Sequence, residues 1–309
     1  TDDERMDEVS SQGYAWGYIG SCIPFIACLA LVLGSDKIGL SMESAMAVSF
    51  AIVAVWWIVM TLPLLKTYRQ RHYVERKPHA VKDSFTRIGR TLVNARKEKK
   101  IFLFLIAFFF YIDGVYTIID MATAYGSALG LDSTGLLLAL LVTQLVAFPS
   151  AIIFGKLAKR FNTEKLILVC ISAYMFIAIF AIFLATQLQF WILAVLVGMF
   201  QGGVQALSRS YFAKIIPVEQ AGEYFGLMDI CGKGAAFLGT TVVGVVTQIT
   251  GSMSKGVGMI SVFFVIGIVF FNMAMKVDCA GKVHADKKTH NEEPVEDMGG
   301  NYKYPIDIV

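Results

Sequence analysis

Histidine and cysteine are scarce in this chain of 309 residues, and neither forms a pattern typical of a metal or disulfide site. The histidines belong to a basic loop and to the polar C-terminal tail: His72, His79, His284 and His290. The cysteines lack the CxxC spacing of zinc sites: Cys22, Cys28, Cys170, Cys231 and Cys279. We therefore expect no metal ion, no cofactor and no histidine proton relay inside the apolar segments.

The chain also lacks the polarity of a soluble domain. Hydrophobic residues make up 56% of it and its mean hydropathy is +0.62, whereas soluble domains are about 45–50% apolar. The alternating segments of about ten residues that form transmembrane barrels are absent. Eight long apolar segments, each near the ~20 residues that a helix needs to cross a bilayer, are present instead: 13–34, 45–65, 101–126, 133–157, 165–187, 190–208, 222–250 and 256–276. The sequence therefore predicts an all-helical integral membrane protein.

Positive charge is concentrated in alternate links between these segments. Residues 66–100 contain twelve Lys or Arg, and the link at 156–165 contains four more, while the opposite links contain only Lys37 and Lys255. The positive-inside rule therefore predicts that both basic links and both termini of this chain are cytoplasmic. We expect the basic residues to anchor this topology, not to bind nucleic acid. A bacterial plasma membrane is the expected location.

The spacing of the segments predicts four regions. They are two spans at 1–65, a basic cytoplasmic loop at 66–100, six spans at 101–276 and a polar cytoplasmic tail at 277–309. The stretch DSFTRIGRTLVNARKEKK in the loop has apolar residues at helical spacing, which predicts an amphipathic helix. This helix either lies on the membrane surface or packs beneath the bundle. The first residue is Thr1 and an acidic polar lead follows it, so we expect an N-terminally incomplete sequence.

Two carboxylates, Asp113 and Asp120, lie in the third apolar segment. A charge near the bilayer centre costs about 2.5 to 3.5 kcal/mol on the insertion scale, so such residues usually face a bundle interior or a watery cavity. Seven residues apart, the two share a helix face with Tyr116 and Thr117. Asp113 is expected near the midplane as a proton-titrating or substrate-facing group, and Asp120 near the outer surface as a gate residue. Ion pairs that only join helices are the alternative for both.

The sixth apolar segment and the residue after it place Gln201, Gln205 and Arg209 on one helix face, at steps of four residues. An amide at the midplane suits a zwitterionic or hydroxylated solute, but glutamine also joins membrane helices to each other. Arg209 is expected at the cytoplasmic end, in a gate or an interface pair. Gln144, midway through the fourth segment, is a further candidate for the cavity wall.

The seventh segment carries Asp229 and Lys233 at the spacing of an intrahelical ion pair. An interhelical contact from Lys233 to Asp113 is the alternative, because the two are expected at a similar depth. An intramembrane aspartyl protease would instead pair Asp113 with Asp229. The paired Tyr-Asp and Gly-x-Gly-Asp signatures of such proteases are absent, so we expect no enzymatic activity.

Glycines recur at short intervals in two of the segments. Gly13, Gly17 and Gly20 in the first segment are expected to let that helix approach a neighbour closely, as small residues do in membranes. The stretch GKGAAFLG at 232–239 is expected to do the same in the seventh segment. Structural use is therefore the interpretation for these glycines.

Residues 200–239, FQGGVQALSRSYFAKIIPVEQAGEYFGLMDICGKGAAFLG, resemble the vacuole-effluxer-like (autophagy-related) branch of the major facilitator superfamily. FFFYIDGVYTII and VSSQGYAWGYIG are two further stretches similar to that family, and together the similarity covers most of residues 8–276. The resemblance implies a bundle of twelve spans in two halves, with alternating access around a midplane site. The eight spans here would correspond to the fifth through twelfth.

The link GKLAKRFNTEK at 155–165 resembles the superfamily's cytoplasmic Gly-x-x-x-Asp-Arg-x-Gly motif. Gly155 and Arg160 match it, whereas Lys159 stands at the position of the acid and Asn162 at that of the second glycine. The resemblance implies a conformational latch at this link, with Arg160 as a gating residue.

The function that the resemblance implies is secondary active transport of small solutes, with amino acids as the leading class. Proton coupling is a hypothesis that depends on Asp113. The expected partners are a small solute, the lipid bilayer and protons. A non-transporting sensor or assembly partner built on a transporter fold is the alternative, and the intramembrane protease is a remote one.

Overall fold

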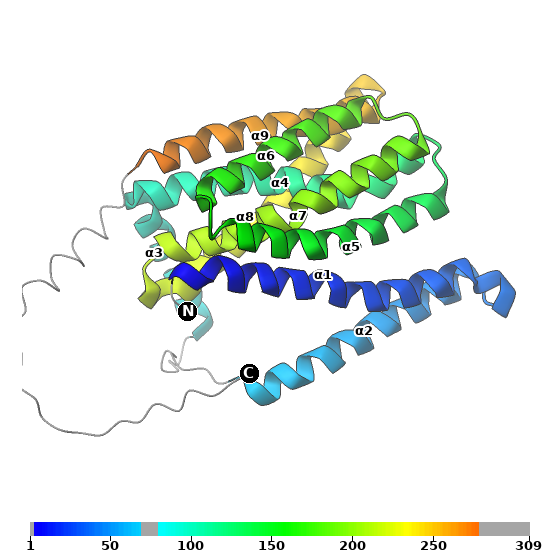
Figure 1. Cartoon of the computed structure of the whole chain (residues 1–309), viewed down its shortest axis with the longest axis horizontal. Coiled ribbons are helices and arrows are strands. Elements are labelled where there is room, and N and C mark those ends of the chain that lie inside the picture. Colours follow the sequence, from blue (N-terminus) through cyan, green and yellow to red (C-terminus); the bar gives the residue numbers. More distant parts are fainter. Residues whose placement is uncertain (1–2, 69–79, 278–309) are drawn as a thin grey trace, which may run out of the picture. The chain divides into compact units, whose positions relative to one another are not determined.

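The computed structural model describes residues 3–68 and 80–277 (Figure 1). Eight helices in these ranges are long and apolar enough to cross a membrane, which confirms the expected all-α class. They are α1 Asp3–Leu33, α2 Met42–Thr67, α4 Lys99–Ala128, α5 Ser133–Leu157, α6 Thr163–Ile182, α7 Gln187–Ile215, α8 Ala221–Thr250 and α9 Met253–Met275. Part of the basic loop, the expected tail from residue 278, all four histidines and Cys279 lie outside the described residues.

Two helix boundaries differ from the apolar segments. α1 begins at Asp3, so the acidic lead that was expected before the first span is itself helical. α6 ends at Ile182 and not near residue 187, because Thr186 starts the next helix. The Thr186 side chain accepts the backbone N–H of Gln189, and the Gln189 side chain reaches back to the Thr186 N–H. This capping box fixes the start of α7.

The helices pack in an order that sets α4 and α7 inside the bundle. α4 contacts α8 and α9, α7 contacts α5 and α6, and α1 lies along α5 and α7 (Figure 1). Within the described residues, α2 packs mainly on α1 and on the short 3-10 helix η1 Ser35–Ile38. Most of its apolar surface is exposed, as expected for a helix that faces lipid or further membrane spans.

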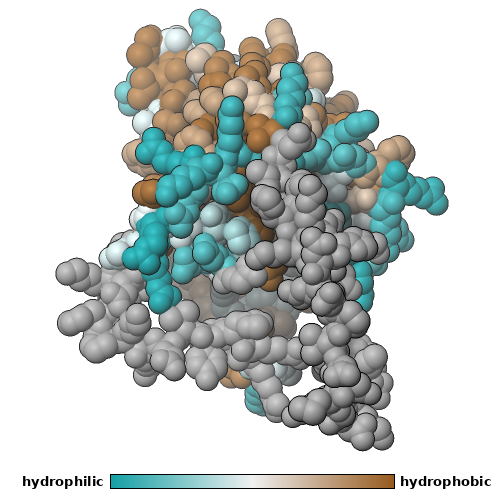
Figure 2. All heavy atoms as spheres, turned by 90° about the vertical axis from the view of Figure 1, so that its left-hand side faces the viewer, coloured by the Kyte–Doolittle hydropathy of each residue, from teal (hydrophilic) through white to brown (hydrophobic). Residues whose placement is uncertain are grey.

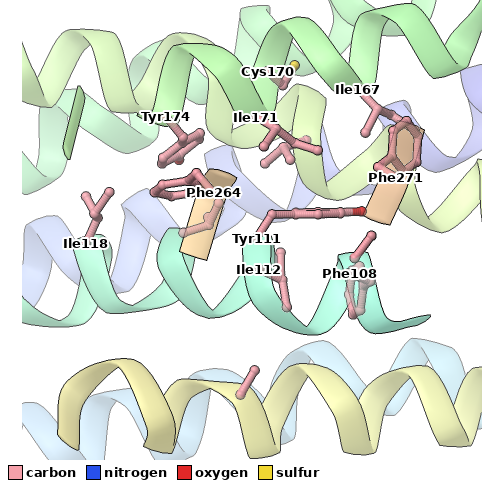
Figure 3. Packing of buried hydrophobic residues seen from close by; sticks show 14 of the residues in the cluster. Phe108, Tyr111, Ile112, Ile118, Ile167, Cys170, Ile171, Tyr174, Phe264 and Phe271 are labelled. Atoms are coloured by element: carbon pink, nitrogen blue, oxygen red, sulfur yellow. The ribbon is translucent and has the colours of Figure 1, made fainter. Parts of the chain in front are cut away.

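Aromatic side chains fill the core between α4, α6, α7 and α9 (Figure 3). The ring of Tyr111 meets Phe271 edge-on at 6.5 Å, and its hydroxyl is hydrogen-bonded to Ser208 at 2.7 Å. Gly114 lets α9 come close, since a Cβ there would lie 2.6 Å from the ring of Phe264. Edge-to-face pairs add about 0.5 to 1.5 kcal/mol each beyond their buried area. This core joins α4, α7 and α9 into one unit.

The amphipathic stretch of the basic loop forms α3 Ala80–Lys97, which packs against α4 and α8. Thr91 donates its hydroxyl to Glu223 Oε2 at 2.7 Å, and Arg87 Nη1 lies 4.0 Å from Glu223 Oε1. Of the two expected positions, packing on the bundle is therefore the one observed. Hydrophilic side chains gather at this end of the helices (Figure 2).

Candidate functional site

A cavity of about 860 Å³ lies between α1, α5, α7 and α8. Its polar wall is formed by Tyr14 and Tyr18 of α1, Gln144 of α5, and Gln205 and Arg209 of α7. Three of these five were predicted from the sequence, and the two tyrosines were not. Their spacing of four residues on a glycine-containing helix face is the signal that would have found them.

Gly13 and Gly17 line the same cavity. A Cβ at Gly13, Gly17 or Gly20 would meet no described atom within 4 Å. The expectation that these glycines bring α1 close to a neighbour is therefore wrong for the described residues. Because glycine has no side chain, Gly13 and Gly17 widen the cavity along α1. The α1 residues that line the cavity run from Met6 to Ser21, a length of about 22 Å.

A smaller cavity of about 80 Å³ adjoins the large one and carries the charged groups. It shares Tyr14, Gln205 and Arg209 with the large cavity. Its other polar side chains are Tyr116, Asp229 and Lys233. The formal charge of this lining is +1, from two basic side chains and one carboxylate.

The ion pair in this region joins two helices. Arg209 Nη1 of α7 lies 3.7 Å from Asp229 Oδ1 of α8, and the two side chains are 44% and 57% exposed. The Arg209 guanidinium also lies 4.7 Å from the ring centre of Phe225. The predicted pair between Asp229 and Lys233 is not among the salt bridges of the described residues. A half-exposed pair at this distance is weak.

Asp113 is fully buried between α4 and α8. Its Oδ1 accepts the backbone N–H of Gly239 at 3.0 Å and the hydroxyl of Thr117 at 3.3 Å. Its Oδ2 has no hydrogen-bond partner among the described residues. Burying a carboxylate with an unpaired oxygen is costly. Asp113 does not belong to the described lining of either cavity, whereas Tyr116 on the same helix does.

Asp113 is not close to the other charged residues that the sequence offered as partners. Because Asp113 accepts the backbone N–H of Gly239, the two residues lie at the same position along the axis of α8. Lys233 is six residues and Asp229 ten residues before that position, or about 9 Å and 15 Å along the helix. The expected similar depth of Lys233 and Asp113 is therefore wrong, and the carboxylate dyad of a protease is not formed. Asp120 is exposed on α4.

Among the buried or half-buried polar atoms that have no hydrogen-bond partner in the described residues are the Oε1 atoms of Gln144 on α5 and Gln201 on α7. The side chain of Gln201 also interacts with the hydroxyl of Tyr18 on α1. Gln201 is only 4% exposed. A buried polar atom without a partner costs about 1 to 3 kcal/mol. Water or a polar solute would remove this cost.

A buried polar cluster at the N-terminal end of α1 was missed from the sequence. Asp7 contacts Thr163 at the start of α6, and Ser210 and Lys214 of α7. The signal was a polar face of α1 that continues from Tyr18 and Tyr14 back to Asp7 at helical spacing.

The link at 155–165 lies beside this cluster. Lys159 Nζ is 2.7 Å from Glu8 Oε2, whereas Arg160 is exposed and makes no ion pair with the described residues. Of these two basic residues, Lys159 is therefore the one that forms an ion pair with α1 in the described residues. The latch role predicted for Arg160 stays a prediction.

Comparison with known proteins gives consistent matches. The family described as "Vacuole effluxer Atg22 like" matches residues 1–284. The uncharacterized MFS-type transporter YxiO of Bacillus subtilis is 48% identical over 271 residues, which are 87% of this chain and 63% of that protein. Autophagy-related protein 22 of Coccidioides immitis is 24% identical over 95% of this chain and 52% of that protein. The chain thus spans 52% to 63% of the length of these two relatives.

Solved structures agree on the fold. The major facilitator superfamily transporter FucP in the outward conformation has a TM-score of 0.61 with this chain at 16% identity. The match covers 90% of this chain and 70% of FucP. A second structure, of the E. coli fucose:proton symporter FucP, has a TM-score of 0.59. These matches show a shared fold.

Proposed function

The chain belongs to the vacuole effluxer Atg22-like family and has the major facilitator fold, and on this premise we propose that it is part of a secondary transporter for small solutes. The observation that carries the proposal is the cavity of about 860 Å³ among apolar, membrane-length helices, into which polar side chains of α1, α5 and α7 extend from a largely apolar wall. Such a cavity offers a solute a hydrogen-bonding path through the membrane region. Transport by alternating access would expose it to each side in turn.

We propose amino acids as the solute class, because the charged groups of the two adjoining cavities suit a zwitterion. The guanidinium of Arg209 can bind a carboxylate through two parallel hydrogen bonds, and Asp229 can bind an ammonium group. Gln205, which lines both cavities, provides hydrogen bonds between them. A zwitterion that binds both Arg209 and Asp229 would replace the ion pair between them, whose atoms lie 3.7 Å apart.

We propose Asp113 as the proton-coupling residue. Its Oδ2 is free to carry a proton, and its Oδ1 bonds to the α8 backbone at Gly239. A change of charge at Asp113 therefore acts directly on the contact between α4 and α8. Coupling through this contact does not require that Asp113 touch the solute.

Uptake of radiolabelled amino acids into liposomes that contain the full-length transporter tests these proposals. Arg209→Gln is expected to raise the KM by about tenfold or more, because it removes a charged contact worth about 1.5 to 3 kcal/mol. Arg90→Gln on the exposed side of α3 is the control and should leave the KM unchanged. The absence of saturable uptake for every amino acid would reject the solute class.

The same liposomes with an imposed pH gradient test the proton-coupling residue. Asp113→Asn keeps an acceptor for the Gly239 N–H but cannot titrate. We expect it to abolish gradient-driven accumulation and to retain exchange of solute across the membrane. Glu43→Gln, at an exposed position in the first turn of α2, is the control. Unchanged coupling in Asp113→Asn would show that another group carries the proton.

A further inference from the structure

The Asp7 cluster, defined as Asp7, Thr163, Ser210 and Lys214, ties the N-terminal end of α1 to α6 and α7. Asp7 Oδ2 lies 2.5 Å from Lys214 Nζ and accepts the Thr163 hydroxyl at 3.0 Å. Asp7 Oδ1 accepts the Ser210 hydroxyl at 2.5 Å. Asp7 is only 5% exposed, so its charge is compensated by these three donors and by little water. Removing one partner from such a buried pair is strongly destabilising to the contact.

The Asp7 cluster lies between two cavities. Ser210 lines the cavity of about 860 Å³. Asp7, Thr163 and Lys214 line another cavity of about 630 Å³ at the end of the bundle. The hydrogen bond from Ser210 to Asp7 therefore joins the lining of one cavity to that of the other. The cluster thus lies where the linings of the two cavities meet.

Other contacts of α1 reinforce the closure at the same end. Ser10 donates its hydroxyl to the backbone oxygen of Ala206 at 2.8 Å. Ser11 lies so close to Gly155 that a Cβ there would be 2.7 Å from the Ser11 Cβ. The α1 helix cannot move away from α7 at this end without breaking the Asp7 contacts first.

We propose that Asp7 is the gating residue that closes the large cavity toward this end of the bundle. The gate is closed in this structure by Ser210 and Lys214. It opens when α1 separates from α7, which connects the two cavities. The inference rests on the proposed transport function, because a gate has meaning only where a solute passes.

Thiol labelling tests the gate without any solute. Gly17→Cys serves as the reporter, because Gly17 lines the large cavity and a Cβ there meets no neighbour. It is introduced into the full-length protein after the native cysteines have been replaced. A second reporter, Phe161→Cys in the 155–165 link, identifies the side of the membrane that this end of the bundle faces. A membrane-impermeant maleimide is then added from that side. Phe161 is exposed.

Asp7→Ala and Lys214→Gln are each expected to raise the labelling rate at the reporter by about tenfold, a shift of about 1.4 kcal/mol in the gate equilibrium. Glu8→Gln is the matched control. It removes the more exposed pair between Glu8 and Lys159 and should change the rate by less than about twofold. The exchange Asp7→Lys with Lys214→Asp should return the rate toward that of the parent protein.

Equal labelling rates in Asp7→Ala and Glu8→Gln would overturn the proposal. If Asp7→Ala does not fold, Ser210→Ala is measured in its place. We expect it to raise the labelling rate about threefold, because one hydrogen bond is lost. An unchanged labelling rate would count against the gate. Solute uptake is measured separately. A protein that shows the labelling pattern without uptake of any amino acid would retain the gate and reject the proposed solute class.

Discussion

At the scale of single residues, the contact between α4 and α8 depends on a glycine. A Cβ at Gly239 would collide with the Thr117 hydroxyl and lie 2.6 Å from Asp113 Oδ1. We expect Gly239→Ala to lower the free energy of unfolding by about 1 to 3 kcal/mol, as overpacking does in well-packed cores. Thermal unfolding of the purified protein in detergent measures this change.

Gly244→Ala on the same helix is the control for that measurement. A Cβ at Gly244 meets no described atom within 4 Å, and alanine favours the helix by about 0.5 to 1 kcal/mol over glycine. The two substitutions should therefore shift the unfolding temperature in opposite directions. Equal shifts would mean that the close approach at Gly239 does not exist in the folded protein.

The sequence predicts some site residues better than others for a physical reason. Gln144 and Gln205 were found because polar side chains are unusual within apolar segments, and Arg209 was found because it continues the helix face of Gln205 by one turn. Asp7 lies before the apolar segment, where charge is ordinary, so only its contacts reveal that it is buried. The partner of Asp229 could not be predicted either, because helical spacing describes one helix and the partner comes from another.

At the scale of elements, the position of α3 depends on the side chain of Glu223. This carboxylate accepts the hydroxyl of Thr91 and lies 4.0 Å from Arg87. A hydrogen bond to a charged group contributes about 1.5 to 3 kcal/mol. We expect Glu223→Ala to release α3 and to accelerate trypsin cleavage within it by about fivefold or more. Timed digestion followed by mass spectrometry measures the rate.

Glu43→Gln serves as the control for the digestion, since Glu43 is exposed in the first turn of α2. Its cleavage rate should equal that of the parent protein. If Glu223→Ala is cleaved no faster than this control, the contact with Glu223 does not hold α3 in place.

Hydropathy predicted all eight spans but not where their helices end. The first helix continues to Asp3 because Asp7 and Ser10 find partners on α7, which apolar content does not record. The sixth span ends early because the capping box of Thr186 and Gln189 starts the next helix. Helix ends follow from local hydrogen bonds, whereas spans follow from length and apolarity.

At the scale of the whole molecule, the distribution of basic residues predicts the orientation in the membrane. We expect Phe161→Cys, in the link at 155–165, to react with a membrane-impermeant maleimide only from the cytoplasmic side. Lys37→Cys in η1, on the opposite side in the predicted topology, should react only from outside. Labelling in intact cells and in inverted vesicles distinguishes the two sides. A reversed pattern would overturn the predicted topology.

The length of α1 determines how far Asp7, near its N-terminal end, moves when the helix tilts. Its 31 residues measure about 46 Å from end to end, and the aromatic core holds α4, α7 and α9 together as a stiff counterpart. Asp7 lies about 39 Å from the far end of α1 at Leu33, so a tilt of about 5° about that end carries Asp7 through about 3 Å. Such a small rotation is already enough to part Asp7 from Ser210 and Lys214. In the proposed gate, the contacts of Asp7 with Ser210 and Lys214 would therefore restrain the tilt of the whole α1 helix.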